Sequence, residues 1–197
     1  EHTNDPAKKE EYMQLMKNAI KDGDDLVASI LNWVDVQSMY MTFELHEHDL
    51  LDVVKNAISV KETNAKLKNI NIDLNIEEGL VMNMDVRMME TIFRNLVCNA
   101  IKFSHRDSSI TVSGKKEGDI VIISIKDQGI GMSEEIKNEL FKYGKIPPRL
   151  GTEDETGSGF GLNICKKMVE NQKGTMEIES KPNEGTTVTI TFPAQLG

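Results

Sequence analysis

Hydrophobic residues recur at steps of three and four along the first part of the chain, which is the spacing of one helix face. From Ala7 to Tyr40 this pattern predicts a long helix, whose apolar stripe consists of Leu15, Met16, Ala19, Ile20, Leu26, Val27, Ile30, Leu31 and Val34. Gly23 interrupts the pattern at a cost of about 1 kcal/mol relative to Ala. A stripe of this length needs a partner, so we expect weak self-association through it.

The spacing changes to a period of two residues after a second predicted helix, which runs from Leu50 to Ile58 with Asp49 as its N-cap. Residues 70–76 and 80–84 alternate between apolar and polar, which predicts two half-buried strands joined at Glu78-Gly79. The later predicted elements are helices over 89–103, 133–142 and 159–171, and strands over 110–112, 120–125, 176–178 and 188–192. The 120–125 run is nearly all apolar, so we expect that strand to be buried on both faces.

This order of elements predicts an α+β fold, in which a helical N-terminal piece precedes a two-layer α/β sandwich with helices on one face of the sheet. The polar stretch from Tyr143 to Gly157 contains Gly and Pro and fits no regular element. Because it is longer than most connections, it is a candidate lid or binding loop.

The composition and net charge of the chain indicate its size class and argue against one class of binding partner. The chain has 197 residues, of which 39% are apolar, and this is enough for one substantial domain. Its net charge of −9 argues against nucleic acid as a partner, because phosphate backbones are bound by clustered Lys and Arg. Cys98 and Cys165 lie in apolar helical patterns, so we expect buried free thiols in a reducing compartment.

The sequence contains no apolar run of about 18 residues and no signal peptide. It begins with Glu1, and we expect it to be part of a longer protein. We expect this part to be cytoplasmic, and the sequence leaves open whether the parent protein is anchored in a membrane.

Three polar residues form a line along the predicted helix over 89–103. Asn95, Asn99 and Lys102 stand at i, i+4 and i+7, beside the apolar stripe. Asn is a poor helix former, so helix propensity does not explain this pair. Amide oxygens suit Mg²⁺, and a lysine ammonium suits phosphate. For this helix taken alone, a solvated polar face is an equally good explanation.

A second candidate is the segment Asp127-Gln-Gly-Ile-Gly131, which directly follows the predicted strand over 120–125. An aspartate at a strand end can accept a hydrogen bond from an exocyclic amine, and glycines beside it let the backbone approach a flat base. Asp-x-Gly turns are common, so a plain turn explains this segment when it is taken by itself.

A third candidate is Gly157-Ser-Gly159-Phe-Gly161-Leu162, which opens a predicted helix. The N–H groups and dipole at a helix start favour a phosphate chain, although a flexible hinge is the alternative. The segment lacks the Gly-Lys-Ser/Thr ending of a P-loop. It also follows a polar loop, whereas a dinucleotide fingerprint follows a strand.

Taken in this order, the segments resemble the GHKL ATPase superfamily, which includes gyrase, Hsp90, histidine kinases and MutL, and they look most like sensor histidine kinases. The matching segments are Asn95–Phe103 for the N box, Asp127–Gly131 for the G1 box, Gly157–Leu162 for the G2 box, Gly185-Thr186-Thr187 for the final Gly-Thr segment and Phe141 for the F box. The resemblance covers roughly residues 43–193. It implies a Bergerat fold, with a mixed sheet covered by helices on one face.

The resemblance also implies a role for each residue. Asn99 would ligate Mg²⁺, Asn95 and Lys102 would face the phosphates of ATP, and Asp127 would bind the adenine amine, supported through water by Thr186. The residues implied to bind nucleotide are Asn95, Asn99, Lys102, Phe103, Asp127, Gly129, Gly131, Phe141, Gly157, Gly159, Gly161, Leu162 and Thr186.

Asn95 distinguishes the branches of the superfamily. Hydrolytic relatives carry Glu at this position, where it acts as a general base on water. Asn cannot accept that proton at neutral pH, which favours transfer to a protein acceptor. The resemblance therefore implies a protein histidine kinase of a bacterial two-component system, with Asn95 and Lys102 as its catalytic residues.

The acceptor histidine is the departure from the family pattern, which is His, then Asp or Glu, then Pro a few residues later. None of the histidines has that context; they are His2, His46, His48 and His105. We therefore expect the acceptor to lie outside this chain, which would be unable to autophosphorylate. Residues 1–42 are expected to be a truncated second dimerisation helix, and residues 43–197 the ATP-binding catalytic domain.

The partners implied by the resemblance are the acceptor-histidine helix of the parent kinase, a response regulator receiver domain and a second copy of the parent in a homodimer. Two other functions stay open from the sequence. One is a nucleotide-binding pseudokinase or scaffold, which would transfer nothing. The other is an anti-sigma-type Ser/Thr kinase of the same fold, although a long N-terminal helix fits a dimerisation bundle better.

Overall fold

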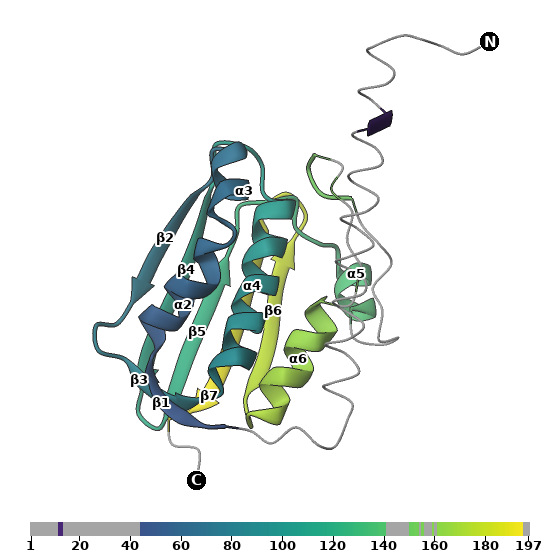
Figure 1. Cartoon of the computed structure of the whole chain (residues 1–197). Helices are drawn as coiled ribbons and strands as arrows, with labels where there is room; N and C mark the ends of the chain where they lie inside the picture. The colour runs from purple at the N-terminus through teal and green to yellow at the C-terminus, as the bar shows by residue number, and fades with distance from the viewer. Residues whose placement is uncertain are drawn as a thin grey trace, which may run out of the picture.

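The fold has two layers, a sheet and a set of helices on one of its faces (Figure 1). The computed structural model describes residues 12–13, 44–140, 150–153, 155, 159 and 161–194. In chain order the elements are β1 (His46–Asp49), α2 (Leu50–Ser59), α3 (Glu62–Leu67), β2 (Asn71–Ile76), β3 (Val81–Met84), α4 (Val86–Phe103), β4 (Ser109–Glu117), β5 (Ile120–Lys126), α5 (Glu134–Glu139), α6 (Gly161–Asn171), β6 (Thr175–Lys181) and β7 (Gly185–Pro193).

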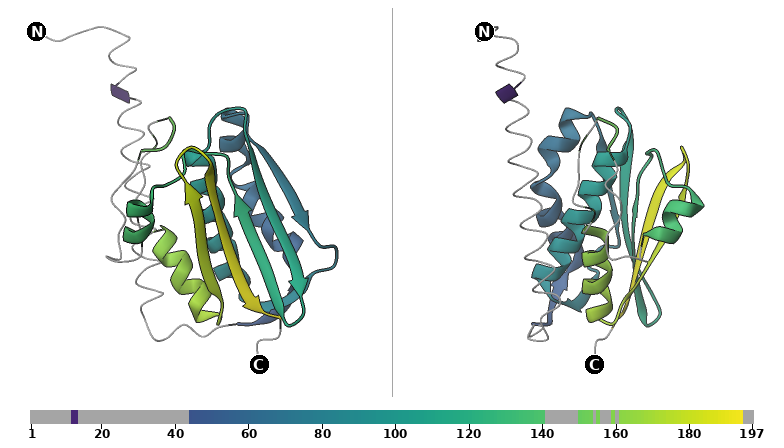
Figure 2. Two further views of the ribbon diagram at one scale, coloured as in Figure 1. Left: turned by 180° about the vertical axis from the view of Figure 1, so that it is seen from behind. Right: turned by 90° about the vertical axis from the view of Figure 1, so that its right-hand side faces the viewer.

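The described strands build a five-stranded sheet in the order β2-β4-β5-β7-β6. β2 runs parallel to β4, with Ile72 opposite Ile110, and the other neighbours are antiparallel. Figure 2 shows α2, α4 and α6 side by side on one face of this sheet. The predicted α+β class, with a mixed sheet covered by helices on one face, is confirmed.

β1 and β3 form a separate antiparallel pair, in which His46 lies opposite Met84. The sequence pattern predicted neither β1 nor α3. β2 and β3 are joined by the tight turn that was predicted, where Gly79 has a φ of 71°. The two strands nevertheless belong to different sheets, because β2 pairs with β4 and β3 pairs with β1.

Side-chain caps determine where the helices begin. The Asp49 carboxylate accepts from the Leu51 N–H at 2.8 Å, which confirms the predicted N-cap of α2. Asp85 accepts from the Met88 N–H at 3.2 Å, so α4 begins three residues before the predicted position 89. Each such cap satisfies an N–H that has no partner within the helix, and contributes about 1 kcal/mol.

The core lies between α4 and the central strands. Ile92 and Phe93 of α4 are fully buried, as are Ile123 of β5 and Ile190 of β7. Burying a side chain of this size contributes about 1.5–3 kcal/mol. The helix that carries the polar line is therefore held in place by the apolar stripe beside that line.

β5 is buried on one face only, so the expectation of two buried faces was wrong. Val121, Ile123 and Ile125 are buried, whereas Ile122 is half-buried and Ile120 is 39% exposed. The physical reason is that helices cover a single face of the sheet. The unbroken apolar run reflects the preference of β-branched residues for strands, and not a second packed layer.

The predicted helix from Ala7 to Tyr40 lies outside the described residues except at Tyr12 and Met13, which are helical and exposed. Among the residues that the structure describes, no helix combines the length and apolar character needed to span a bilayer.

Both cysteines are free thiols, as expected. Only Cys165 is buried, however, whereas Cys98 on α4 is half-buried. Burial raises the pKa of the Cys165 thiol to about 12, so this group stays protonated at neutral pH.

Candidate functional site

The predicted polar line lies on the flank of α4. Asn95, Asn99 and Lys102 are all half-buried, next to the stripe that packs on the sheet. One face of the helix is therefore used for packing, and the adjacent flank holds side chains that reach solvent.

Asn95 is oriented by its own helix and faces the start of another. Its Nδ2 donates to the Thr91 carbonyl at 3.0 Å, which turns Oδ1 away from that carbonyl. Oδ1 lies 3.1 Å from the position that a Cβ would take at Gly161, the first residue of α6. The structure thus brings the Asn-bearing helix and the glycine-rich helix start into contact.

Asp127 follows β5 and is 7% exposed. Its Oδ1 accepts from the Gly129 N–H at 2.9 Å and from the Thr186 N–H at 3.1 Å. No donor among the described residues bonds Oδ2. Among the described residues, the carboxylate is therefore held through one of its two oxygens.

The acidity of Asp127 reflects its environment. Burial raises the pKa of this carboxyl to about 6, from an ordinary value of 3.8. The hydrogen bonds from the Gly129 and Thr186 backbone act in the opposite direction and keep the pKa from rising further. At neutral pH the group is ionised, and it is a strong hydrogen-bond acceptor in a site of low solvent content.

Gly129 joins the aspartate segment to the end of α4. A Cβ at Gly129 would lie 2.1 Å from the Phe103 carbonyl oxygen, so only glycine permits this approach. The Ile130 N–H donates to the same oxygen at 3.0 Å, and Ser104 and Gly129 form a β-bridge. The base-binding candidate and the phosphate-binding candidate are therefore connected through backbone contacts.

Gly131 and Gly185 allow two turns to pack behind Asp127. Gly131 has a φ of 60°, and a Cβ there would lie 1.9 Å from the Lys181 carbonyl oxygen. Gly185 has a φ of 86°, and a Cβ there would lie 2.1 Å from the Asp127 carbonyl oxygen. The β6–β7 turn consequently packs against the backbone of the Asp127–Gly131 segment.

Thr186 contacts Asp127 through its backbone, and its hydroxyl is held by a residue that the sequence analysis missed. Thr186 Oγ1 and the buried Ser180 Oγ lie 2.9 Å apart, and Ser180 Oγ donates to the Gly185 carbonyl at 2.9 Å. No sequence signal identifies Ser180, because a serine in an edge strand is usually exposed.

The remaining residues predicted to bind nucleotide lie at the end of α4 and around the start of α6. Lys102 Nζ lies 4.9 Å from the centroid of the Phe103 ring. Leu162 packs against the core at the start of α6, which begins at Gly161, two residues later than predicted. Gly159 has a φ of 74°, a conformation that favours glycine. Phe141 and Gly157 lie outside the described residues.

The described residues contain no group of three or more His, Cys, Asp or Glu that could hold a metal ion. The side-chain amide of Asn99, the residue implied to ligate Mg²⁺, is half-buried on the flank of α4. An amide oxygen is a type of ligand that suits a hard cation completed by phosphate and water.

The chain is similar to known ATP-binding and kinase proteins. Residues 84–196 match the family model described as histidine kinase-, DNA gyrase B- and HSP90-like ATPase. Sporulation kinase C of Bacillus subtilis is 30% identical over 187 residues, which are 94% of this chain and 41% of that protein. The chain therefore spans less than half the length of this relative.

Two solved structures share the fold. Histidine kinase AdeS of Acinetobacter baumannii has a TM-score of 0.76 at 20% identity, over 93% of this chain and 84% of that one. Histidine kinase ThkA, in a complex with the response regulator protein TrrA, has a TM-score of 0.78 at 22% identity, over 99% of this chain and 54% of that one.

The family model covers the helix with the polar line, the buried aspartate and both closing strands. The resemblance to the ATP-binding domain of sensor histidine kinases is thereby confirmed. Because the match extends over more than half of its residues, the chain belongs to the family of histidine kinase-, DNA gyrase B- and HSP90-like ATPases.

Proposed function

We propose that this domain binds Mg-ATP along the flank of α4 and transfers the γ-phosphoryl group to a histidine outside the chain. The observation that carries the proposal is the buried Asp127, whose Oδ1 is held by two backbone N–H groups beside the C-terminal end of α4. A carboxylate fixed in this way is expensive to bury, and an adenine amine is the donor that would offset that cost.

In this proposal the adenine amine donates to Asp127 Oδ2. Gly129 and Gly131 have no side chains, so the base can lie close to the backbone between α4 and the β6–β7 turn. The Thr186 hydroxyl, positioned by Ser180, would hold a water that bonds both the base and the carboxylate. This arrangement would select adenine because its amine donates a hydrogen bond to Asp127. A base that carries an acceptor in place of the amine would leave the carboxylate unpaired.

The phosphates would lie further along α4, towards α6. Asn99 would ligate Mg²⁺, and Asn95 and Lys102 would contact phosphate oxygens near Gly161, where the helix start offers N–H groups. When bound, the ion neutralises phosphate charge and orients the terminal group. The residues of the chain then bind, orient and exclude water, which is most of what phosphoryl transfer requires.

Asn95 favours transfer of the γ-phosphoryl group to a protein acceptor over hydrolysis of ATP. An amide has no basic site that can take a proton from water at neutral pH. An imidazole needs no such base before it attacks, because the lone pair of its unprotonated nitrogen forms the new N–P bond. The O–P bond breaks as this bond forms, ADP takes its electron pair, and the proton on the other ring nitrogen stays there or passes to water. A histidine delivered in line by another helix would therefore be the acceptor.

We further propose that residues 1–42 form a dimerisation helix and residues 43–197 the catalytic domain, within a parent homodimer. The acceptor helix of the parent and a response regulator receiver domain would be the partners. The crystallised complex of ThkA with TrrA supports a response regulator as partner for proteins of this fold. Since no histidine here has the acceptor context, we expect this chain alone to form no phosphohistidine.

ATP titration with and without Mg²⁺ tests the binding step, with Asp127→Asn as the key variant. We expect this variant to weaken ATP binding by about tenfold or more, because it replaces an anionic acceptor with a weaker neutral one. Asp119→Asn, an exposed residue in the turn after β4, is the matched control. Unchanged affinity in Asp127→Asn would show that the base pocket is assigned wrongly.

Mixing the chain with a fragment that carries an acceptor-histidine helix, in the presence of labelled Mg-ATP, tests the transfer step. Acid-labile, base-stable label on the fragment is expected. Binding without any such label would favour a nucleotide-binding scaffold over a kinase.

A further inference from the structure

Lys68 is a buried lysine that belongs to none of the segments assigned to nucleotide binding. It directly follows α3, three residues before β2, and it is 3% exposed. Buried lysines are rare unless their charge is paired, because moving an ammonium out of water is costly. Its contacts therefore indicate what this part of the fold holds together.

The Lys68 ammonium is surrounded by four oxygen atoms from two separate parts of the chain. Two are the carbonyls of Ile101 and Lys102, in the last turn of α4, each at 3.0 Å. The others are Thr152 Oγ1 at 2.7 Å and Glu155 Oε1 at 2.6 Å. An ammonium has three protons, so its donors are fully used, and its charge is balanced by the carboxylate and by the negative end of the helix dipole.

The segment that contains Thr152 and Glu155 also contacts the end of α4 directly. The Thr152 N–H donates to the Lys102 carbonyl at 3.1 Å, and its hydroxyl donates to the Ser104 carbonyl at 2.7 Å. A Cβ at Gly151 would lie 2.2 Å from Glu155 Oε2 and 2.7 Å from both Cγ and the carbonyl oxygen of Lys102. The segment therefore packs on the lysine that we assign to the phosphates.

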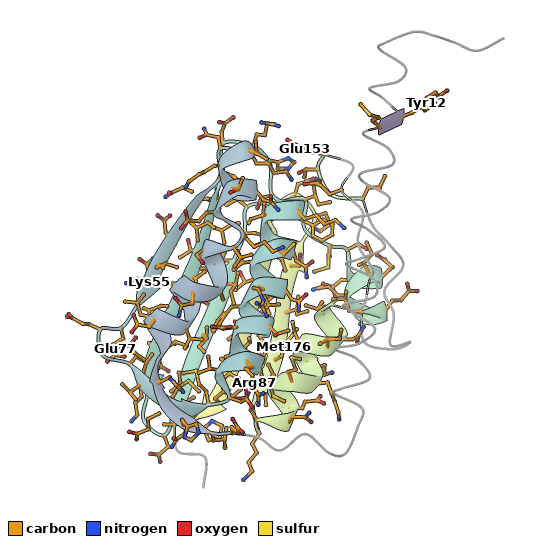
Figure 3. All side chains as sticks on the ribbon, viewed as in Figure 1. Tyr12, Lys55, Glu77, Arg87, Glu153 and Met176 are labelled. Atoms are coloured by element: carbon orange, nitrogen blue, oxygen red, sulfur yellow. The ribbon has the colours of Figure 1, made fainter. Side chains whose placement is uncertain are left out.

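A salt bridge at the surface reinforces the same contact. Arg106 Nε, just beyond α4, lies 2.5 Å from Glu153 Oε1. Figure 3 labels Glu153 at the end of the molecule where α4 terminates, beside α3. This pair is largely exposed and contributes little, about 0–1 kcal/mol, so the buried Lys68 is the stronger connection.

We propose that Lys68 is a positioning residue for nucleotide binding, whose ammonium holds Thr152 and Glu155 against the C-terminal end of α4 and so fixes the place of Lys102. This inference rests on the proposed function. The held segment precedes the glycine-rich start of α6, where Gly161 faces Asn95. Lys68 thereby controls the separation between the helix that bears Asn95 and Lys102 and the backbone that leads to the phosphate-binding glycines.

Three variants and one control test the proposal. Lys68→Met removes the charge but keeps much of the apolar stem, and Glu155→Gln weakens its partner. Gly151→Ala adds a methyl group that would press on the Glu155 carboxylate and on Lys102. Lys66→Met is the matched control, because Lys66 lies two residues earlier and is largely exposed. Within the part of the chain that the structure describes, its ammonium pairs only with Glu62 on its own helix.

The measurements are the Kd for a non-hydrolysable ATP analogue with Mg²⁺, and amide hydrogen exchange in the nucleotide-free protein. We expect the Kd to rise about five- to tenfold in Lys68→Met and in Gly151→Ala, which is the lower end of the range for coupling between sites. Exchange of the Thr152 amide should become faster, while amides of β5 keep their protection. Lys66→Met should behave as the wild type in both measurements.

A purely structural role for Lys68 would speed exchange throughout the domain and leave the Kd of the folded fraction unchanged, and that result would overturn the proposal. Unaltered exchange at Thr152 would overturn it as well. If Lys68→Met does not fold, the same two measurements on Gly151→Ala and Glu155→Gln test the proposal, since both variants leave Lys68 in place. Failure of the wild type itself to bind the analogue would instead refute the proposed function, and with it the role of Lys68 in binding nucleotide.

Discussion

The amide oxygen of Asn95 on α4 and Gly161 at the first position of α6 face each other so closely that a methyl group would lie 3.1 Å from the oxygen. This spacing is tighter than an ordinary van der Waals contact. The two helices come from separate parts of the sequence, and their approach creates the place where phosphates are proposed to bind.

Gly161→Ala should therefore weaken binding of Mg-ATP without weakening the fold. Alanine is favoured over glycine in a helix by up to about 1 kcal/mol, so stability should be unchanged or slightly higher. The added methyl group would press on Asn95 Oδ1, and we expect the Kd for Mg-ATP to rise about tenfold, which corresponds to roughly 1.4 kcal/mol. Adenosine, which lacks phosphates, is the internal control, and an equal loss of adenosine affinity would contradict this reading. Calorimetric titration measures the Kd of both ligands.

Binding of adenosine should depend on pH through Asp127. Its pKa is raised by burial to about 6, so protonation below that value removes the anionic acceptor for the adenine amine. The affinity should therefore be constant above pH 7 and fall as the pH drops through 6, by about tenfold at pH 5. Titrations from pH 5 to 8 measure this, and Asp127→Asn should show little dependence on pH. A wild-type affinity that does not change over this range would be inconsistent with Asp127 as the acceptor.

The same group should lower the stability of the nucleotide-free protein. Its folded pKa of about 6 lies above the ordinary 3.8, so the folded state binds more protons between these values, and stability falls as the pH rises through them. Asp127→Asn keeps an oxygen for the two N–H donors and removes the buried charge. We expect it to raise the free energy of unfolding by about 1–3 kcal/mol at pH 7.5, and by less at pH 4. Urea denaturation at both pH values, with Asp119→Asn as control, measures the difference.

Ser180→Ala should affect both stability and adenine binding. The substitution removes the hydrogen bond to the Gly185 carbonyl and the contact with the Thr186 hydroxyl, both at 2.9 Å. Losing a buried hydrogen bond costs about 1–2 kcal/mol. The Kd for adenosine should rise a few-fold, because the Thr186 hydroxyl is no longer positioned. Ser124→Ala, at a half-buried position on β5, is the control. A variant with the full loss of stability but wild-type affinity would show that Thr186 needs no support.

Much of the site could be predicted because its signals are local. The spacing of Asn95, Asn99 and Lys102 is a property of one helix, and Asp127 and Gly129 stand next to each other at the end of one strand. The N-cap at Asp49 was predicted for the same reason, since a capping side chain bonds an N–H two residues away.

The elements that were missed depend on contacts between distant segments. His46–Asp49 forms a strand only because residues 81–84 pair with it, and β2 runs parallel to β4 across an intervening helix. No local pattern singles out Lys68, because its partners Thr152 and Glu155 follow it by more than eighty residues. The register of sheets and the burial of a charge are set by tertiary packing, which no local pattern reports.

The contact between Gly129 and the Phe103 carbonyl has a consequence for how the domain would recognise its ligand. Since the backbone that presents Asp127 touches the helix that presents Lys102, the two recognition elements cannot move apart independently. A ligand that joins a purine to a triphosphate then gains from both at once, whereas separate pieces each lose their own freedom of motion. Adenosine and tripolyphosphate added together should consequently fail to reproduce the affinity of intact ATP at any accessible concentration.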